Sequence, residues 1–245
     1  MVRKKKADLY LLGLGINGVD QLTREVEEVL RKCRVVFHIS YSHNELTRLN
    51  PNVISLDDEY WTDEPHRVVY ARLIRRIMSE VERGPGVASV TYGHPIFFDN
   101  VHTNLRNTCA RKKLNCVVLP GISSLDTLSV DLNIDYGDGL TVLEATTMVD
   151  NQVPPNPDLH TLIFQIGEYG MSTTNELASD DADRFLSMQN YLLNFYEEDH
   201  PIVLATSDRG EGVELIRSRL RRLNSHRNRI QLGSTMYLPP ACEWV

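Results

Sequence analysis

The sequence lacks the patterns that mark metal sites, disulfide frameworks and membrane spans. Its four cysteines form no CxxC pair, and its eight histidines include no HExxH motif. We therefore expect reduced thiols and no bound metal. No apolar run approaches the ~20 residues that a membrane-spanning helix needs. The basic N-terminus, Met1–Lys6, leads straight into a predicted strand and does not resemble a signal peptide.

An excess of positive charge is also missing. The formal net charge is −7, which argues against a general nucleic-acid binder. With 42% hydrophobic and 24% charged residues, the composition is that of an ordinary soluble protein. The 245 residues suffice for one large domain or for two small α/β lobes. A cytoplasmic enzyme, without nucleic-acid or membrane partners, is the default expectation.

The first half of the chain predicts a parallel α/β sheet. Ala7–Leu12 is typical of a strand, and a glycine turn separates it from a helix between about Asp20 and Cys33. Val35–Ile39 is the next strand, so this stretch forms a βαβ unit. From Pro65 to about Arg83, apolar residues recur at i, i+3 and i+4, which predicts a long helix with one buried face.

The first glycine turn matches GxGxxG, a motif that suggests a dinucleotide such as NAD. That interpretation requires an acidic residue at the end of the second strand, where it would bind a ribose hydroxyl. The second strand instead runs into His38–His43, which contains no carboxylate. The missing carboxylate disfavours an NAD oxidoreductase.

Three strand ends break at glycine or proline, and we interpret them as the walls of one ligand cleft. They are Leu11–Gly15, Val90–Phe98 and Val118–Ser124. Glycine lets the backbone approach a ligand, and open α/β sheets bind small molecules at the carboxyl ends of their strands. Ser123 and Ser124 open the helix after the third break, so either helix capping or ligand contact would explain them.

The second half is less patterned and predicts a mixed α/β lobe. Gly212–Leu223 is predicted as a helix and Ile230–Leu232 as a short strand. Glu168–Asp183 is polar without periodicity, which predicts a mobile loop or lid over the cleft. On and after the predicted helix, six arginines would be scattered over a solvated face, which is favoured over a site for an acidic partner: Arg217, Arg219, Arg221, Arg222, Arg227 and Arg229.

In their order and spacing, the three glycine breaks resemble the tetrapyrrole methylase superfamily, which uses S-adenosylmethionine. The similarity covers nearly the whole chain and is tightest to the borosin-type peptide-backbone N-methyltransferases. It rests on short motifs taken together: Leu49–Asn52, Tyr60 with Tyr70, Tyr92–Pro95, Leu119–Ser123, Asp131–Asp135, Glu144–Thr146, Gln165–Gly167 and Ser234–Pro240. The resemblance implies an α/β fold of two unequal lobes, residues 1–118 and 119–245, with the methyl donor in the cleft between them.

The resemblance also implies site residues. In the borosin enzymes, two tyrosines and an arginine surround the acceptor amide. Tyr60 and Tyr70 fall in register, whereas the arginine's register falls on His66 and Arg67 lies one residue beyond, so either could take the third role. Ile96 replaces the family's usual glycine, and substrate identity therefore carries over poorly. Contacts to S-adenosylmethionine would come from Leu14, Tyr92, His94, Phe97, Ser123, Ser124, Gln165 and Thr235.

We hypothesise that Tyr70 takes the amide proton, that Arg67 stabilises charge on the amide oxygen, and that Tyr60 orients Tyr70 or the acceptor. The sequence ends soon after Pro240 without a core-peptide tail. We therefore expect a separate precursor peptide bound in trans, as in the biosynthesis of ribosomally made, modified peptides, and a homodimer. The alternatives are methylation of a tetrapyrrole or other small molecule, or a donor-binding partner protein that has lost its chemistry.

Overall fold

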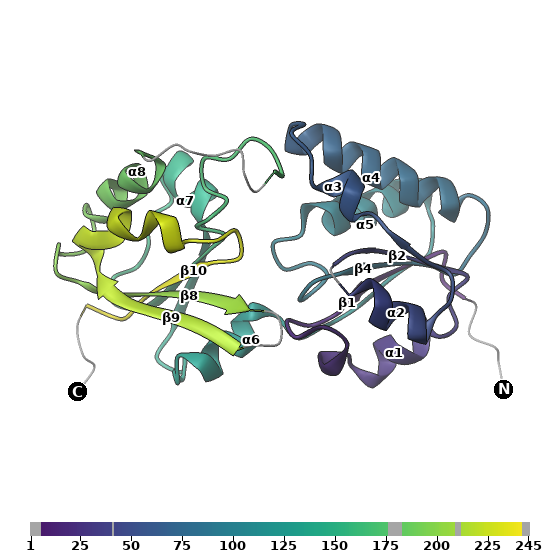
Figure 1. Cartoon of the computed structure of the whole chain (residues 1–245), viewed down its shortest axis with the longest axis horizontal. Coiled ribbons are helices and arrows are strands. Elements are labelled where there is room, and N and C mark those ends of the chain that lie inside the picture. Colours follow the sequence, from purple (N-terminus) through teal and green to yellow (C-terminus); the bar gives the residue numbers. More distant parts are fainter. Residues whose placement is uncertain (1–5, 41, 176–182, 209–211, 242–245) are drawn as a thin grey trace. The chain divides into compact units, whose positions relative to one another are not determined.

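The computed structural model describes residues 6–40, 42–175, 183–208 and 212–241, which form two compact units (Figure 1). Unit 1 contains the described part of residues 1–127 together with Ser172–Asn175. Unit 2 contains Leu128–Met171 and the described part of residues 176–245. Among the helices of the described residues, none combines the length and the apolarity that crossing a bilayer requires.

Unit 1 is built on a five-stranded sheet in the order β3-β2-β4-β1-β5, and every pairing in it is parallel. This confirms the predicted parallel sheet. Strands β1, β2 and β4 are almost entirely buried, as expected where helices cover both faces of a sheet. The strands are β1 (Leu9–Gly13), β2 (Val35–Ile39), β3 (Val53–Ser55), β4 (Val87–Thr91) and β5 (Cys116–Leu119).

Two helical layers bury the faces of this sheet. On one face, Leu73 and Ile77 of α4 and Leu105 of α5 pack against β1, β2 and β4. On the other face, Val26 of α1 and Leu46 of α2 complete a second apolar cluster. The helices of this part of the chain are η1 (Gly18–Gln21), α1 (Arg24–Leu30), α2 (His43–Leu49), α3 (Asp57–Tyr60), α4 (His66–Val81), α5 (Asn100–Lys112) and α6 (Ser124–Asp131).

Unit 2 contains a mixed five-stranded sheet in the order β6-β7-β10-β8-β9. Only β6 and β7 pair in parallel, and the other pairings are antiparallel, as the weaker patterning of this half predicts. Its strands are β6 (Leu140–Glu144), β7 (His160–Phe164), β8 (Pro201–Asp208), β9 (Gly212–Arg219) and β10 (Thr235–Leu238). Three helical segments accompany them: α7 (Ala145–Asp150), α8 (Asp183–Leu192) and the 3₁₀ segment η2 (Leu220–Arg229).

Two predictions for this half are wrong. Gly212–Leu223 is not a helix, because Gly212–Arg219 forms β9 and pairs with β8 along its whole length. Its apolar residues fit both a strand and a helix period, and pairing with β8 decides between them. Ile230–Leu232 is not a strand but part of the loop that follows η2.

Candidate functional site

The carboxyl ends of β1, β4 and β5 meet at three glycines. A Cβ atom on Gly13 would lie 2.5 Å from the Gly93 carbonyl oxygen and 2.8 Å from the Gly121 Cα atom. A Cβ atom on Gly121 would lie 2.7 Å from the same Gly93 oxygen. We call these three residues the glycine junction. Because it has no side chains, backbone groups of three strand ends are brought to the edge of the sheet where α/β folds bind ligands.

Two hydrogen bonds fix the turns beside the junction. The Gly93 N–H donates to the Gly15 carbonyl at 3.0 Å, and the Gly15 N–H donates to the Gly93 carbonyl at 3.3 Å. Gly15 and Gly93 have φ angles of +85° and +70°, which side chains rarely allow. The GxGxxG turn therefore serves to pack two loops together.

The residues of unit 1 that we predict to contact S-adenosylmethionine surround this junction. Leu14 is buried and its N–H donates to the Thr91 carbonyl at 2.9 Å. Tyr92 follows β4 and is 39% exposed, and Phe97 is half-buried with its ring centroid 4.5 Å from that of Phe98. Aromatic side chains beside a few backbone polar groups are typical of small-molecule pockets.

His94 lies in the same loop and is held in its neutral form. Its Nδ1 accepts the Ile96 N–H at 3.3 Å, so the remaining ring proton lies on Nε2. Burial lowers the pKa of His94, and the charge of Asp126 opposes that shift. The loop therefore carries a neutral hydrogen-bond donor.

Ser123 serves the start of α6. Its N–H and its hydroxyl both donate to the Asp126 carboxylate at 2.7 Å, and its side chain is buried. The contact from the Ser123 N–H to the Asp126 carboxylate is one half of a capping box, whereas the Ser123 hydroxyl donates to the same carboxylate. Ser124 is the first residue of α6 and is half-buried.

In unit 2, the two other predicted donor contacts lie at adjacent strand ends. Gln165 directly follows β7 and has a φ of +57°, and Thr235 opens β10 and is buried. The Ile166 N–H donates to the Ser234 carbonyl at 3.2 Å, which joins the two loops. Gly167 completes the turn, because a Cβ atom there would lie 2.0 Å from the Gln231 carbonyl oxygen.

The predicted acceptor residues form a stack of rings in unit 1. The Tyr60 and Tyr70 ring centroids are 6.3 Å apart with an interplanar angle of 19°. His66 stacks on Tyr70 at 5.6 Å with an interplanar angle of 1°. We call Tyr60, Tyr70 and His66 the aromatic stack. Arg67 is exposed on the next position of α4, outside the ring contacts of the stack.

The loop between α3 and α4, which joins Tyr60 to His66, is fastened by Ser172–Asn175, which we call the strap. Thr174 Oγ1 donates to the Tyr60 carbonyl and accepts the Thr62 N–H at 3.2 Å. The His66 N–H, which opens α4, donates to the Ser172 carbonyl at 3.2 Å. The strap belongs to the predicted lid, of which residues 176–182 lie outside the described residues. Its contacts hold the backbone from Tyr60 to the start of α4.

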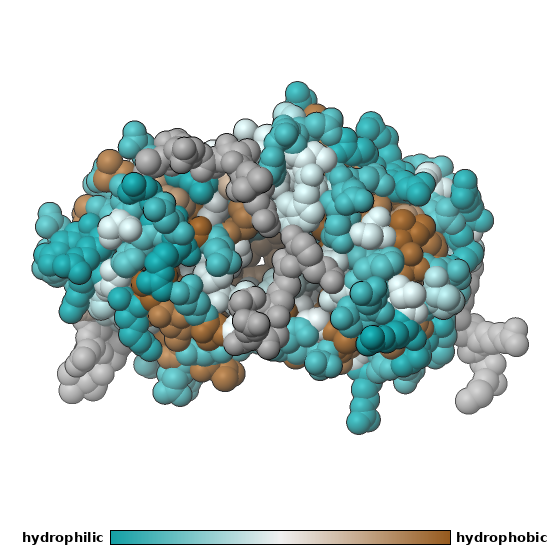
Figure 2. Space-filling model, in the orientation of Figure 1, coloured by the Kyte–Doolittle hydropathy of each residue, from teal (hydrophilic) through white to brown (hydrophobic). Residues whose placement is uncertain are grey.

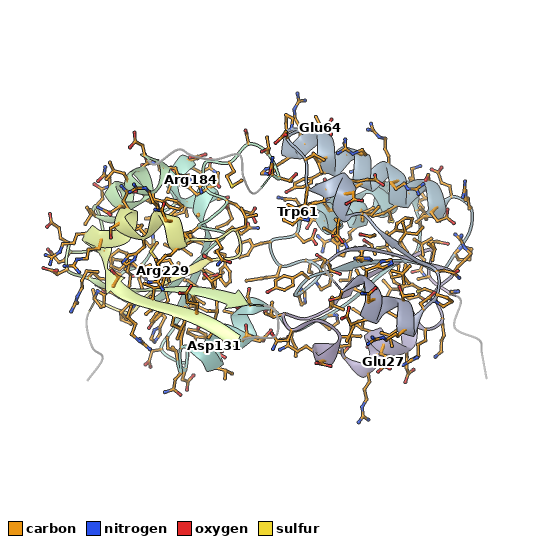
Figure 3. All side chains as sticks on the ribbon, viewed as in Figure 1. Glu27, Trp61, Glu64, Asp131, Arg184 and Arg229 are labelled. Atoms are coloured by element: carbon orange, nitrogen blue, oxygen red, sulfur yellow. The ribbon has the colours of Figure 1, made fainter. Side chains whose placement is uncertain are left out.

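Two features near these sites were not predicted from the sequence. Trp61 meets Tyr60 edge-on at 4.8 Å and lies, like Glu64, in the loop between α3 and α4 (Figure 3). In unit 2, burial and the charge of Glu144 raise the pKa of Glu168 to about 7. The Glu144–Glu168 pair has no sequence signal, because only the fold brings the two carboxylates together. Within the described residues, no group of three or more His, Cys, Asp or Glu side chains could hold a metal ion.

Comparisons with known proteins bear on the fold and on the family. The family model described as Tetrapyrrole (Corrin/Porphyrin) Methylases matches residues 8–207. The solved structure of uroporphyrin-III C-methyltransferase from Thermus thermophilus, complexed with S-adenyl homocysteine, superposes with a TM-score of 0.65 at 14% identity. That superposition covers 94% of this chain and 96% of the other, and it confirms the predicted α/β fold.

Two curated relatives combine a methyltransferase with a cyclic peptide precursor. One, from Dendrothele bispora, is a methyltransferase and precursor of the cyclic peptide dendrothelin A, and it is 26% identical over 81% of this chain and 48% of its own length. The other, from Coprinopsis marcescibilis, is a methyltransferase and type I borosin cyclic peptide precursor, 26% identical over 96% of this chain and 63% of its own length. The chain thus spans about half of the first relative and less than two thirds of the second.

Proposed function

Because this chain belongs to the tetrapyrrole (corrin/porphyrin) methylase family, we propose that it transfers a methyl group from S-adenosylmethionine to backbone amide nitrogens of a peptide. The observation that carries the peptide assignment is the aromatic stack, in which the rings of Tyr60, Tyr70 and His66 lie together. By resemblance in sequence, these three residues correspond to the acceptor residues of the borosin enzymes. The curated relatives, which combine a methyltransferase with a peptide precursor, support the same substrate class.

The glycine junction fits the methyl donor. Its three glycines let the ends of three strands meet without side chains at the edge of the sheet where α/β folds bind ligands. Tyr92 and Phe97 offer apolar cover for a planar ring. Neutral His94 offers an Nε2–H for a polar group of the donor. When bound, S-adenosylmethionine supplies an electrophilic methyl group on a positively charged sulfur.

The acceptor side must activate a poor nucleophile, because an amide nitrogen attacks only as it loses its proton. We assign proton removal to Tyr70 acting as its phenolate, which takes up the amide proton as the nitrogen bonds to the methyl group; the ordinary pKa of a tyrosine is about 10. His66, parallel to the Tyr70 ring, takes the third role in place of an arginine, and a positive charge on it would favour the Tyr70 phenolate. Tyr60, held through its backbone by the strap, orients Tyr70 and the acceptor.

The test is methyl transfer to added peptides. The purified protein would be incubated with deuteromethyl-labelled S-adenosylmethionine and a peptide panel, and tandem mass spectrometry would locate the label. The proposal expects labelled backbone nitrogens. Label confined to side chains, or transfer only to an added porphyrinogen, would contradict the peptide-amide assignment. A peptide bound in trans and a homodimer stay predictions that rest on the family resemblance.

A further inference from the structure

The strand assignment of Gly212–Arg219 changes how its arginines are arranged. On a strand, residues two apart share a face, so Arg217 and Arg219 lie on one side of β9. The β8–β9 register places Val203 beside Arg217 and Pro201 beside Arg219 on that same side. The arginines are thus gathered at one end of the hairpin, where a helix would have dispersed them.

An open depression with a volume of about 510 Å³ lies at this end of the hairpin, entirely within unit 2. Strand β9 supplies Arg217, Ser218 and Arg219 to its lining, and η2 supplies Arg222, Ser225 and His226. Apolar residues of β8, among them Pro201 and Val203, form the rest of its wall. We call it the arginine pocket. Arg229, labelled in Figure 3, lies on η2 outside the lining, and the hydrophilic surface of this region shows in Figure 2.

The arginines that line the pocket differ from their neighbours in charge compensation. Arg221 forms an ion pair with Asp199, and Arg229 forms one with Glu214. Among the described residues, Arg217, Arg219 and Arg222 have no carboxylate within ion-pair distance, and Arg219 donates to the backbone carbonyl of Asp199 at 2.8 Å. Three arginines without a carboxylate partner thus line one open depression, although the chain has a net charge of −7.

Two further polar groups of the lining lie where β9 meets η2, because Ser218 points to the face of β9 opposite Arg217 and Arg219. His226 Nε2 lies 2.8 Å from the Ser218 hydroxyl. Burial lowers the pKa of His226, and the charges of Arg229 and Arg222 lower it further. Guanidinium groups cannot accept hydrogen bonds and bind planar or tetrahedral oxyanions through paired N–H groups. The wall therefore suits a ligand with many acceptor oxygens and more than one negative charge.

We propose that the arginine pocket binds a phosphorylated small molecule, with its phosphates on the arginine wall and its organic part against Pro201 and Val203. Phosphate fits better than a single carboxylate, because it offers more acceptor oxygens and a higher charge to three guanidinium groups. This site does not depend on the proposed methyl transfer, so either assignment can fail without the other.

Isothermal titration with cytidine diphosphate tests the proposal, with saturating S-adenosylhomocysteine present to occupy the donor site. Saturable binding is expected, and the double variant Arg217→Gln/Arg222→Gln should weaken it at least about tenfold. Arg227→Gln is the matched control, because Arg227 is exposed on η2 and does not line the pocket. In the wild-type protein, the ligand should raise the pKa of His226, measured by NMR, since a bound anion faces the imidazole together with Arg222 and Arg229.

Four results would overturn the proposal. The first is equal weakening in Arg227→Gln, which would mean diffuse charge attraction. The second is binding of pyrophosphate without binding of cytidine diphosphate, which would show that the pocket does not accept the organic part of a ligand. The third is binding of hexaglutamate alone, which would make the pocket a dock for acidic peptides. The fourth is no saturable binding of cytidine diphosphate to the wild-type protein.

Discussion

At the scale of single residues, the position of His66 determines how the acceptor site is interpreted. His66 is parallel to the Tyr70 ring, while Arg67 points elsewhere on α4 and is exposed. The tyrosine spacing and the His66 register could be predicted from sequence by resemblance. The choice between His66 and Arg67 could not be predicted, because neighbouring helix positions differ by about 100° in direction and the exact start of α4 is known only from the structure.

We predict that His66→Ala lowers turnover about tenfold or more while leaving donor binding unchanged, because the side chain acts next to Tyr70. Arg67→Ala is the matched control and should change turnover by no more than about twofold. Steady-state kinetics with a peptide that the wild type methylates would measure both effects. A large loss in Arg67→Ala with a normal His66→Ala variant would return the third role to the arginine.

A second residue-scale prediction concerns Glu168. Its pKa is raised from 4.5 to about 7, so between these values the folded state binds more protons than the unfolded state. Stability contributed by this group is therefore lost as pH rises through that window. Glu168→Gln should be more stable than the wild type at pH 8, by up to about 3 kcal/mol, and nearly equal to it at pH 4.5.

Urea unfolding at the two pH values would check the Glu168 prediction. Glu197→Gln removes a carboxylate from an exposed position and serves as the control. If the Glu168→Gln and Glu197→Gln variants showed the same pH dependence as the wild type, Glu168 would not be a buried carboxyl group with a raised pKa.

At the scale of elements, the glycine junction joins three strand ends. Gly121→Ala should destabilise the fold by about 1 to 3 kcal/mol, because its Cβ would meet Gly93 and Gly13 backbone atoms at less than 3 Å. It should also weaken binding of S-adenosylhomocysteine, since the strand ends must separate. Gly137→Ala is the control, as its nearest contact would be 3.4 Å from Asp135. Thermal unfolding and calorimetric titration measure both effects, and unchanged ligand affinity in Gly121→Ala would argue against the junction as the donor site.

The strap predicts a second effect at this scale. Thr174→Val would leave the Thr62 N–H and the Tyr60 carbonyl without their side-chain partner, at a cost of about 1 to 3 kcal/mol. We expect faster hydrogen exchange at the Thr62 amide and slower turnover. Thr173→Val is the matched neighbour, because its contact in the strap is a backbone bridge to Pro65. Unchanged exchange at Thr62 in Thr174→Val would show that the strap does not hold this loop.

The elements differ in how well sequence predicts them. Unbroken apolar strands and the stripe on α4 have one consistent period, and those predictions are confirmed. The helix prediction for Gly212–Arg219 is wrong because its apolar residues fit both a helix period and a strand period. Its pairing with β8 decides between them, and no local sequence pattern shows a contact between two segments. The contacts of the strap could not be predicted for the same reason, since Thr174 and Tyr60 are 114 positions apart in the sequence.

At the scale of the whole molecule, family membership and the methyl donor follow from motifs spread over both units. The acceptor does not, because substrate identity depends on side-chain shapes such as Ile96 that vary within a family. The peptide assignment therefore rests on the aromatic stack, and a measurement on Tyr70 tests it most directly.

That measurement compares the wild type, Tyr70→Phe and Tyr10→Phe for the amount of N-methylated backbone amide formed on one peptide, quantified by tandem mass spectrometry. Tyr10→Phe makes the same chemical change at a hydroxyl that accepts the Ala7 N–H, away from the aromatic stack. We predict that Tyr70→Phe loses at least about 100-fold in turnover with donor affinity intact, and that Tyr10→Phe stays active. Equal turnover by Tyr70→Phe and the wild type would contradict the account.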